Sequence, residues 1–174
     1  TYAATPMPFG AGPLQGSRLL QDVLASLKAR AFAGGEDGFV MVLNRDGSAL
    51  LKGCYLGGQG RDSANAIAVS ASGQVFVAGD TQSRDFPVSA DAGQKTFGGG
   101  LSDAFLVRLN SSDLGRTYST FLGGSRDDAI LALAADDAGK AFSSGTTSSL
   151  DYPATSALMP PGQRMAGIDA FVAL

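Results

Sequence analysis

The sequence contains no histidine among its 174 residues. Without an imidazole, the Ser-His-Asp and Cys-His forms of nucleophilic catalysis are excluded, and so is every metal site built on histidine. The single cysteine, Cys54, permits no internal disulfide. Because it lies in a strand-like segment and no partner base is in sight, we interpret Cys54 as a buried structural thiol rather than a nucleophile.

Charged residues are also few, at 17% of the chain, and the formal net charge is −3. No basic cluster occurs, which argues against nucleic acid and against an anionic membrane surface as partners. The longest mostly apolar stretch, residues 19–33, contains Asp22, Lys28 and Arg30. It is too short and too charged to span a bilayer, so the sequence predicts no transmembrane segment. No signal peptide opens the chain, yet Thr1 is not an initiator methionine, which fits a processed or partial product.

Glycine, in contrast, is abundant, with 24 residues, and much of it belongs to a pattern that returns at a step of 66 residues. Asp37-Gly38-Phe39-Val40 recurs as Asp103-Ala104-Phe105-Leu106 and as Asp169-Ala170-Phe171-Val172. Leu56-Gly57-Gly58 recurs as Leu122-Gly123-Gly124, and Asp85-Phe86-Pro87 as Asp151-Tyr152-Pro153. A fixed step of this kind indicates a repeat architecture. A residue present in every copy then serves the fold, so a functional site is to be sought where the copies differ.

Each repeat contains four strand-like segments. Alternation of apolar and polar residues predicts strands at 39–44, 50–56, 64–70 and 74–79, and again at 105–110, 116–122, 130–135 and 140–144. Gly73 and Gly139 lie in short turns that suit tight hairpins, because glycine accepts a positive φ. Four antiparallel strands joined by short turns form a meander, the unit of a β-propeller blade. The aromatic residue before each Pro, Phe86 or Tyr152, is expected to fill a gap between neighbouring sheets.

The N-terminal part is an imperfect copy. Residues 9–12 resemble residues 76–79, but residues 18–31 diverge from the repeat and have apolar residues at helical spacing. Ser17 could cap the start of this amphipathic helix, and Gly34-Gly35 could end it. The helix is expected either to pack over a sheet edge or to dock another chain. The candidate interaction residues are Leu20, Val23, Leu24 and Leu27.

These spaced elements resemble the bacterial SBBP-repeat family, named for an expected seven-bladed β-propeller. The resemblance runs from about Asp37 to Leu174, through segments such as residues 103–110, 118–125 and 73–87. It implies an all-β fold of propeller-like blades in tandem and an extracytoplasmic setting: periplasmic, cell-surface or secreted. It implies no defined enzymatic activity and no catalytic residues.

The repeat divides the chain into four parts: a partial blade with the helix at 1–36, repeats at 37–102 and 103–168, and a first strand at 169–174. The two whole repeats are fewer than the roughly four to eight blades of a propeller. Both ends fall inside a blade, and an unpaired apolar edge strand is a feature that proteins avoid. We therefore expect more repeats in a longer chain, a partner chain at the open edges, or sheets that stack without closing a ring.

Paired carboxylates are the remaining candidates for site chemistry. Asp62, Asp127 and Asp128 lie in the turns after Leu-Gly-Gly, and a second acidic pair lies at 136–137. Two carboxylates could serve glycoside hydrolysis at a suitable separation, or hold Ca²⁺ together with backbone carbonyls. The interpretation that we favour is structural: Asp side chains in glycine-rich turns accept hydrogen bonds from backbone N–H groups. The same role explains the repeated Asp37, Asp103 and Asp169.

The glycine-rich segments 57–60 and 98–100 are interpreted as turns rather than phosphate loops, because neither is followed by Lys-Ser/Thr. The repeated aromatic residues, such as Phe39 with Phe105 and Phe76 with Phe142, are expected in the core. Together these observations favour a non-catalytic scaffold or protein-interaction module. A carbohydrate-binding or carbohydrate-active propeller using the Asp-rich turns, and a structural subunit completed by a partner chain, are the alternatives.

Overall fold

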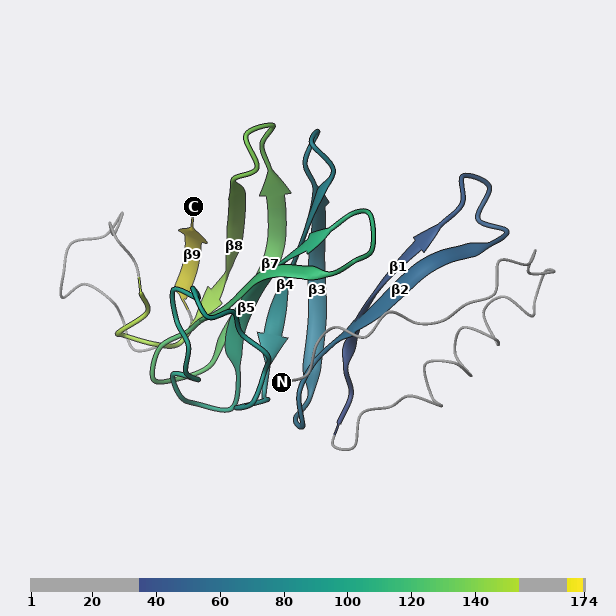
Figure 1. Ribbon diagram of the computed structural model, residues 1–174. Helices are drawn as coiled ribbons and strands as arrows, with labels where there is room; N and C mark the ends of the chain where they lie inside the picture. Colours follow the sequence, from purple (N-terminus) through teal and green to yellow (C-terminus); the bar gives the residue numbers. More distant parts are fainter. Residues whose placement is uncertain (1–34, 154–168, 174) are drawn as a thin grey trace.

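The computed structural model describes residues 35–153 and the backbone of residues 169–173. Within these ranges the chain folds into strands and turns without a helix, which confirms the all-β class (Figure 1). Among the described residues, no helix is long and apolar enough to cross a membrane. The strands are β1 (Gly38–Leu43), β2 (Leu50–Leu56), β3 (Asp62–Val69), β4 (Gln74–Thr81), β5 (Asp103–Asn110), β6 (Arg116–Leu122), β7 (Asp128–Ala135), β8 (Ala141–Thr147) and β9 (Asp169–Ala173).

The strands pair antiparallel in three sheets, of order β1-β2, β3-β4-β5-β6 and β7-β8-β9, over the described residues. The sequence predicted that the four segments of one repeat form one meander. The structure shows that they do not. The four-stranded sheet instead joins the second hairpin of the first repeat to the first hairpin of the second. The reason is that the long connection after β4 returns the chain antiparallel beside it, from Gln74 opposite Asn110 to Thr81 opposite Asp103.

The β3-β4 and β7-β8 hairpins, which lie one repeat step apart, share the same local features. The tight hairpin turns after β3 and β7 each have a glycine with a φ of 80°, Gly73 and Gly139, as predicted. Each of these hairpins also contains a β-bulge, at Asn65 in β3 and at Leu131 in β7. At the first bulge a side chain on Gly79 would lie 1.8 Å from the carbonyl oxygen of Ser63, so only glycine fits there.

The main core lies between the β1-β2 sheet and the four-stranded sheet. Phe86, from the connection after β4, stacks on Phe105 of β5 with ring centroids 4.5 Å apart, which agrees with its expected place between sheets. A second cluster, on the other face of the four-stranded sheet, packs Ala78 and Ala104 against Ile130 of β7. The main core consists of Val40, Cys54, Leu56, Val75, Val77, Phe86, Phe105, Val107, Leu109, Leu114 and Phe121.

Strands β3 and β7 lie side by side, and the β1-β2 hairpin leans away from them (Figure 1). The side-chain amide of Asn65 in β3 donates to the carbonyl oxygen of Ile130 in β7 at 3.1 Å. At the other side, the Lys52 ammonium of β2 donates to the carbonyl oxygens of Ser111 and Ser112, next to β5. Polar contacts thus join consecutive sheets in addition to the apolar core.

Candidate interaction surface

The first sequence-predicted site residue, Asp62, is buried at the start of β3. Its Oδ2 atom accepts hydrogen bonds from the Gly58 backbone N–H at 2.9 Å and from the Ser83 hydroxyl at 2.7 Å. Its Oδ1 atom accepts one from the Thr81 hydroxyl. Burial raises the pKa of this carboxyl, and the hydrogen bonds from Thr81 and Ser83 oppose that rise. Asp62 therefore fastens the turn after β2 to the end of β4.

Asp128 repeats this arrangement in the next copy. Its Oδ2 atom accepts from the Gly124 backbone N–H at 2.7 Å and from the Ser149 hydroxyl at 2.8 Å. The copies differ at Oδ1, because the Thr147 hydroxyl donates to the Ser149 carbonyl oxygen instead. Among the described residues, Asp128 Oδ1 receives no hydrogen bond.

Asp127 has a separate role from its neighbour. Its Oδ1 atom accepts a hydrogen bond from the Leu101 backbone N–H at 2.6 Å, which ties the turn before β5 to the turn before β7. No group of three or more acidic or cysteine side chains close enough to hold a metal ion occurs in the part of the chain that the structure describes. The structural role that the sequence favoured agrees with these contacts. Backbone N–H or hydroxyl groups donate hydrogen bonds to the carboxylates of Asp62, Asp127 and Asp128.

The glycine-rich turn 57–60 directs its backbone donors inward. The N–H of Gln59 donates to Asp85 Oδ1 at 2.9 Å, and that of Gly60 donates to the Ser83 hydroxyl at 2.8 Å. In the second copy Ser125 and Arg126 make the same contacts to Asp151 and Ser149. These hydrogen bonds from Ser125 also lower the pKa of Asp151. Because the protein's own side chains occupy these donors, the turn acts as a structural element rather than an anion cradle.

Asp103 lies fully buried at the start of β5. Its carboxylate accepts backbone hydrogen bonds from Gly98 at 2.5 Å and from Gly99 at 3.4 Å, the turn-fixing role predicted for it. Burial nevertheless raises the pKa of Asp103 to about 6, and the charge of nearby Asp128 adds to the rise. The side chain of Asp169 lies outside the described residues.

Cys54 of β2 is buried in the main core, as predicted. Burial raises the pKa of its thiol to about 11, so the neutral form is the one present near neutral pH. The thiol is a core group.

The copies differ most in what covers their first strand. Phe105 of β5 is completely buried, whereas its equivalent one repeat earlier, Phe39 of β1, is 45% exposed. Leu109 and its equivalent Leu43 show the same contrast, at 1% and 43%. The sequence-based placement of Phe39 in the core was therefore wrong. The physical reason is that β5 has β4 beside it and Phe86 on its face, while β1 is hydrogen-bonded only to β2 among the described strands.

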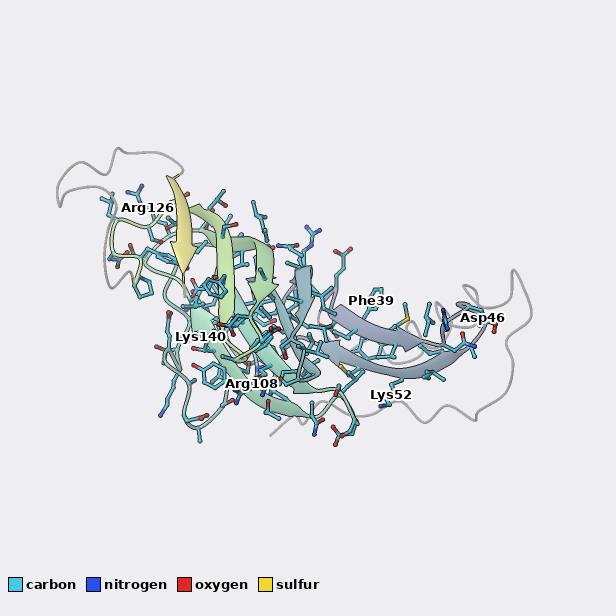
Figure 2. All side chains as sticks on the ribbon, turned by 90° about the horizontal axis from the view of Figure 1, so that it is seen from above. Phe39, Asp46, Lys52, Arg108, Arg126 and Lys140 are labelled. Carbon is cyan, nitrogen blue, oxygen red and sulfur yellow. The ribbon has the colours of Figure 1, made fainter. Side chains whose placement is uncertain are left out.

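Phe39 stands near the base of the β1-β2 hairpin, where the hairpin meets the rest of the molecule (Figure 2). There a depression of about 280 Å³ separates the edge of β1 from β3. Its lining, mainly apolar, includes Phe39, Met41, Ala64, Asn65, Ile67 and Val77. Ile67 is 56% exposed, although its equivalent in β7, Leu133, is packed against the second core cluster. We call this region the β1–β3 depression.

A second exposed apolar area lies on the last complete hairpin. Phe142 of β8 is 37% exposed, whereas its equivalent Phe76 of β4 is buried. Leu131, at the bulge of β7, is 54% exposed. In the described part of the chain, apolar side chains are therefore exposed on the first hairpin and on the last complete one.

Four sequence-predicted interaction residues, Leu20, Val23, Leu24 and Leu27, lie outside the described residues, as does the helix predicted at 18–31. The surface at Phe39 and Ile67 was not found from the sequence. The available signal in the sequence was that residues 1–36 copy the repeat only in part.

The chain matches no protein-family model, and no curated protein is significantly similar to it.

Proposed function

We propose that this chain is a non-catalytic scaffold and protein-interaction module that binds an extended segment of polypeptide at the β1–β3 depression. The observation that carries the proposal is the contrast between Phe39, 45% exposed, and Phe105, fully buried at the same place in the repeat. Exposed apolar residues that line a depression beside an unpaired strand edge are typical of a site for strand addition.

The four-stranded sheet indicates what the bound segment resembles. There β4 supplies eight residues of antiparallel pairing to β5, and Phe86 then covers Phe105. A ligand for β1 would supply the same two features: an extended apolar segment and an aromatic residue a few positions beyond it. Main-chain hydrogen bonds would provide affinity, and the aromatic residue would provide specificity.

The buried carboxylates support the non-catalytic part of the proposal. Asp62 and Asp128 are committed to backbone N–H and hydroxyl groups at equivalent positions. Neither has the solvent access that a general acid or base needs to reach a substrate. An extracytoplasmic bacterial setting within a propeller-like assembly is part of the same proposal, and it rests on the sequence resemblance alone.

A peptide can test the binding step. A fluorescently labelled peptide with the sequence of residues 74–87 contains the β4 strand and its aromatic residue. We expect it to bind the 174-residue chain in a fluorescence anisotropy titration. The variant Phe39→Asp should weaken binding about tenfold or more, since one buried aromatic contact is replaced by a charge. The matched control is Leu101→Asp, at a residue that is 76% exposed and lies in the connection before β5, in contact with Asp127. Equal binding by both variants, or no binding by the native chain, would overturn the proposal.

A further inference from the structure

The four-stranded sheet provides a template for the two incomplete sheets. It consists of an inner hairpin, β3-β4, and an outer hairpin, β5-β6, joined between β4 and β5. The β1-β2 sheet is an outer hairpin without an inner one in the described part of the chain. The β7-β8 hairpin is an inner one, and within the described residues its outer neighbour is the five-residue strand β9. The two incomplete sheets are therefore complementary.

The same motif, Asp-x-Phe-Val, opens β9 and begins one residue before β1, two repeats apart. In the present sheet, β8 pairs with β9 from Ser143 opposite Ala173 to Thr147 opposite Asp169. Strand β1 lies two repeat steps before β9 in the sequence. If β1 paired with β8 in the register of β9, Ser143 would lie opposite Met41 and Gly145 opposite Phe39. The edge of β8 that binds β9 is thus suited to β1.

The exposed side chains fit the same arrangement. An inner hairpin placed beside β1 would fill the β1–β3 depression and cover Ile67, as the cluster that contains Ala78 of β4 covers Leu133. The exposed Phe142 lies on that hairpin. Tyr152, which follows β8, occupies the repeat position of Phe86, so it would come to lie near Phe39 as Phe86 does near Phe105.

We infer that two copies of this chain associate head to tail, with β1 of one copy replacing β9 on β8 of the next. This inference rests on the proposed function, because it names the polypeptide that the β1–β3 depression binds. The product is a four-stranded sheet of order β7-β8-β1-β2 with strands from two copies. β1 can take the place of β9 on β8 because it follows the same Asp-x-Phe-Val motif and meets the β8 edge in the same register. Such an interface is heterologous, so it leads to a closed ring or an open filament.

Light scattering coupled to gel filtration is the first test. We expect masses that are multiples of 17.6 kDa and that increase with protein concentration. Phe39→Asp and Ile67→Asp should each give the monomer mass with an unchanged circular dichroism spectrum. Leu101→Asp should associate like the native chain. A native chain that stays monomeric at all concentrations would overturn the inference.

Cysteine cross-linking tests the register and does not depend on a disruptive substitution. In a Cys54→Ala background, Met41→Cys protein is mixed with Ser143→Cys protein and oxidised. We expect a disulfide-linked dimer of the two variants on a non-reducing gel. Arg45→Cys, in the turn at the far end of the β1-β2 hairpin, replaces Met41→Cys as the control and should give no such dimer. Equal cross-linking of both pairs would contradict the register.

The two proposals fail differently. If the chain is monomeric but the 74–87 peptide binds in a manner that depends on Phe39, the depression binds polypeptide and self-association is wrong. If the chain is monomeric and the peptide does not bind, both proposals are wrong.

Discussion

The backbone N–H of Gly124 lies 2.7 Å from Oδ2 of Asp128, and the same contact joins Gly58 to Asp62 at 2.9 Å one repeat earlier. In both places the glycine follows an outer strand and the aspartate opens an inner one. The contact therefore fastens the turn at which the chain leaves one sheet and enters the next.

Replacing either aspartate should destabilise the protein. Asp62→Ala removes an acceptor from Gly58, Ser83 and Thr81 and should lower the free energy of unfolding by about 3 kcal/mol, since buried donors lose their partner. Asp128→Ala should cost less, about 2 kcal/mol, because Oδ1 of Asp128 has no described partner to lose. Urea denaturation measures both values.

The exposed Asp91→Ala variant is the control and should change stability by less than about 0.5 kcal/mol. A cost for Asp128→Ala that equals or exceeds that of Asp62→Ala would contradict this account. Adding Ca²⁺ gives a further readout. A rise in the melting temperature of the native protein that is absent from Asp62→Ala or Asp128→Ala would assign a metal to these carboxylates.

Gly79→Ala should be strongly destabilising. The added methyl group would lie 1.8 Å from the Ser63 carbonyl oxygen at the β3 bulge, so the hairpin would have to separate there. We expect a loss of about 3 kcal/mol in urea denaturation, as for an overpacked site that forces a backbone shift. Gly47→Ala is the contrast, because Gly47 has a φ of 72° but nothing within 4 Å of the added atom. It should cost about 1 kcal/mol, the strain of a left-handed residue. Equal losses would show that space at the bulge is not the cause.

Asp103 should make stability depend on pH. Its pKa is about 6 in the folded protein, above the usual value of about 3.9 expected when unfolded. Between about pH 4 and 6 the folded state therefore binds more protons, so stability declines as the pH rises through this window. Asp103→Asn should show a smaller decline, measured by denaturation at several pH values.

Asp151→Asn is an opposite-sign control for Asp103. The pKa of Asp151 is lowered by hydrogen bonds from Ser125, so this carboxylate stabilises the protein above its unfolded pKa and loses that effect as the pH falls. Removing it should reduce the loss of stability in acid. A pH profile of Asp103→Asn that is parallel to that of the native protein would show that Asp103 is not the source of the decline.

The Cys54 thiol should resist modification in the folded protein. It is buried, and its pKa is raised to about 11, so it offers little thiolate near neutral pH. A chromogenic disulfide reagent should react in denaturant at the rate of a free thiol, and in buffer only as fast as the protein unfolds. Rapid reaction in buffer would contradict the position of β2 in the core.

Local features of this fold could be predicted from the sequence, because they depend on neighbouring residues. The hairpin turns at Gly73 and Gly139 require a positive φ, and the strands follow from alternation. The division into sheets could not be predicted in this way. It depends on a long connection that returns β5 to β4, and on the hydrogen bond from Gly58 to Asp62, neither of which changes the alternation pattern.

The candidate surface shows a second limit. Phe39 and Phe105 lie in the same motif, and the sequence treats them alike. Their burial differs because one strand has a neighbour on its open edge and the other does not, among the described residues. Burial of a repeated residue depends on which element packs beside it in the folded protein. In the sequence, the sign of this difference is that residues 1–36 copy the repeat only in part.

The boundaries of the sequence repeat do not coincide with the boundaries of the sheets. This has a consequence for how such chains lengthen or shorten. The four-stranded sheet takes one hairpin from each of two consecutive repeats, so neither repeat forms this sheet from its own residues. Insertion or loss of one whole 66-residue unit adds or removes one sheet and leaves all other pairings intact. A domain boundary drawn at the motif would instead separate β4 from β5 and leave the paired edges of both strands without a partner. Fragments of this chain intended for study are therefore best cut in the turns after Leu-Gly-Gly.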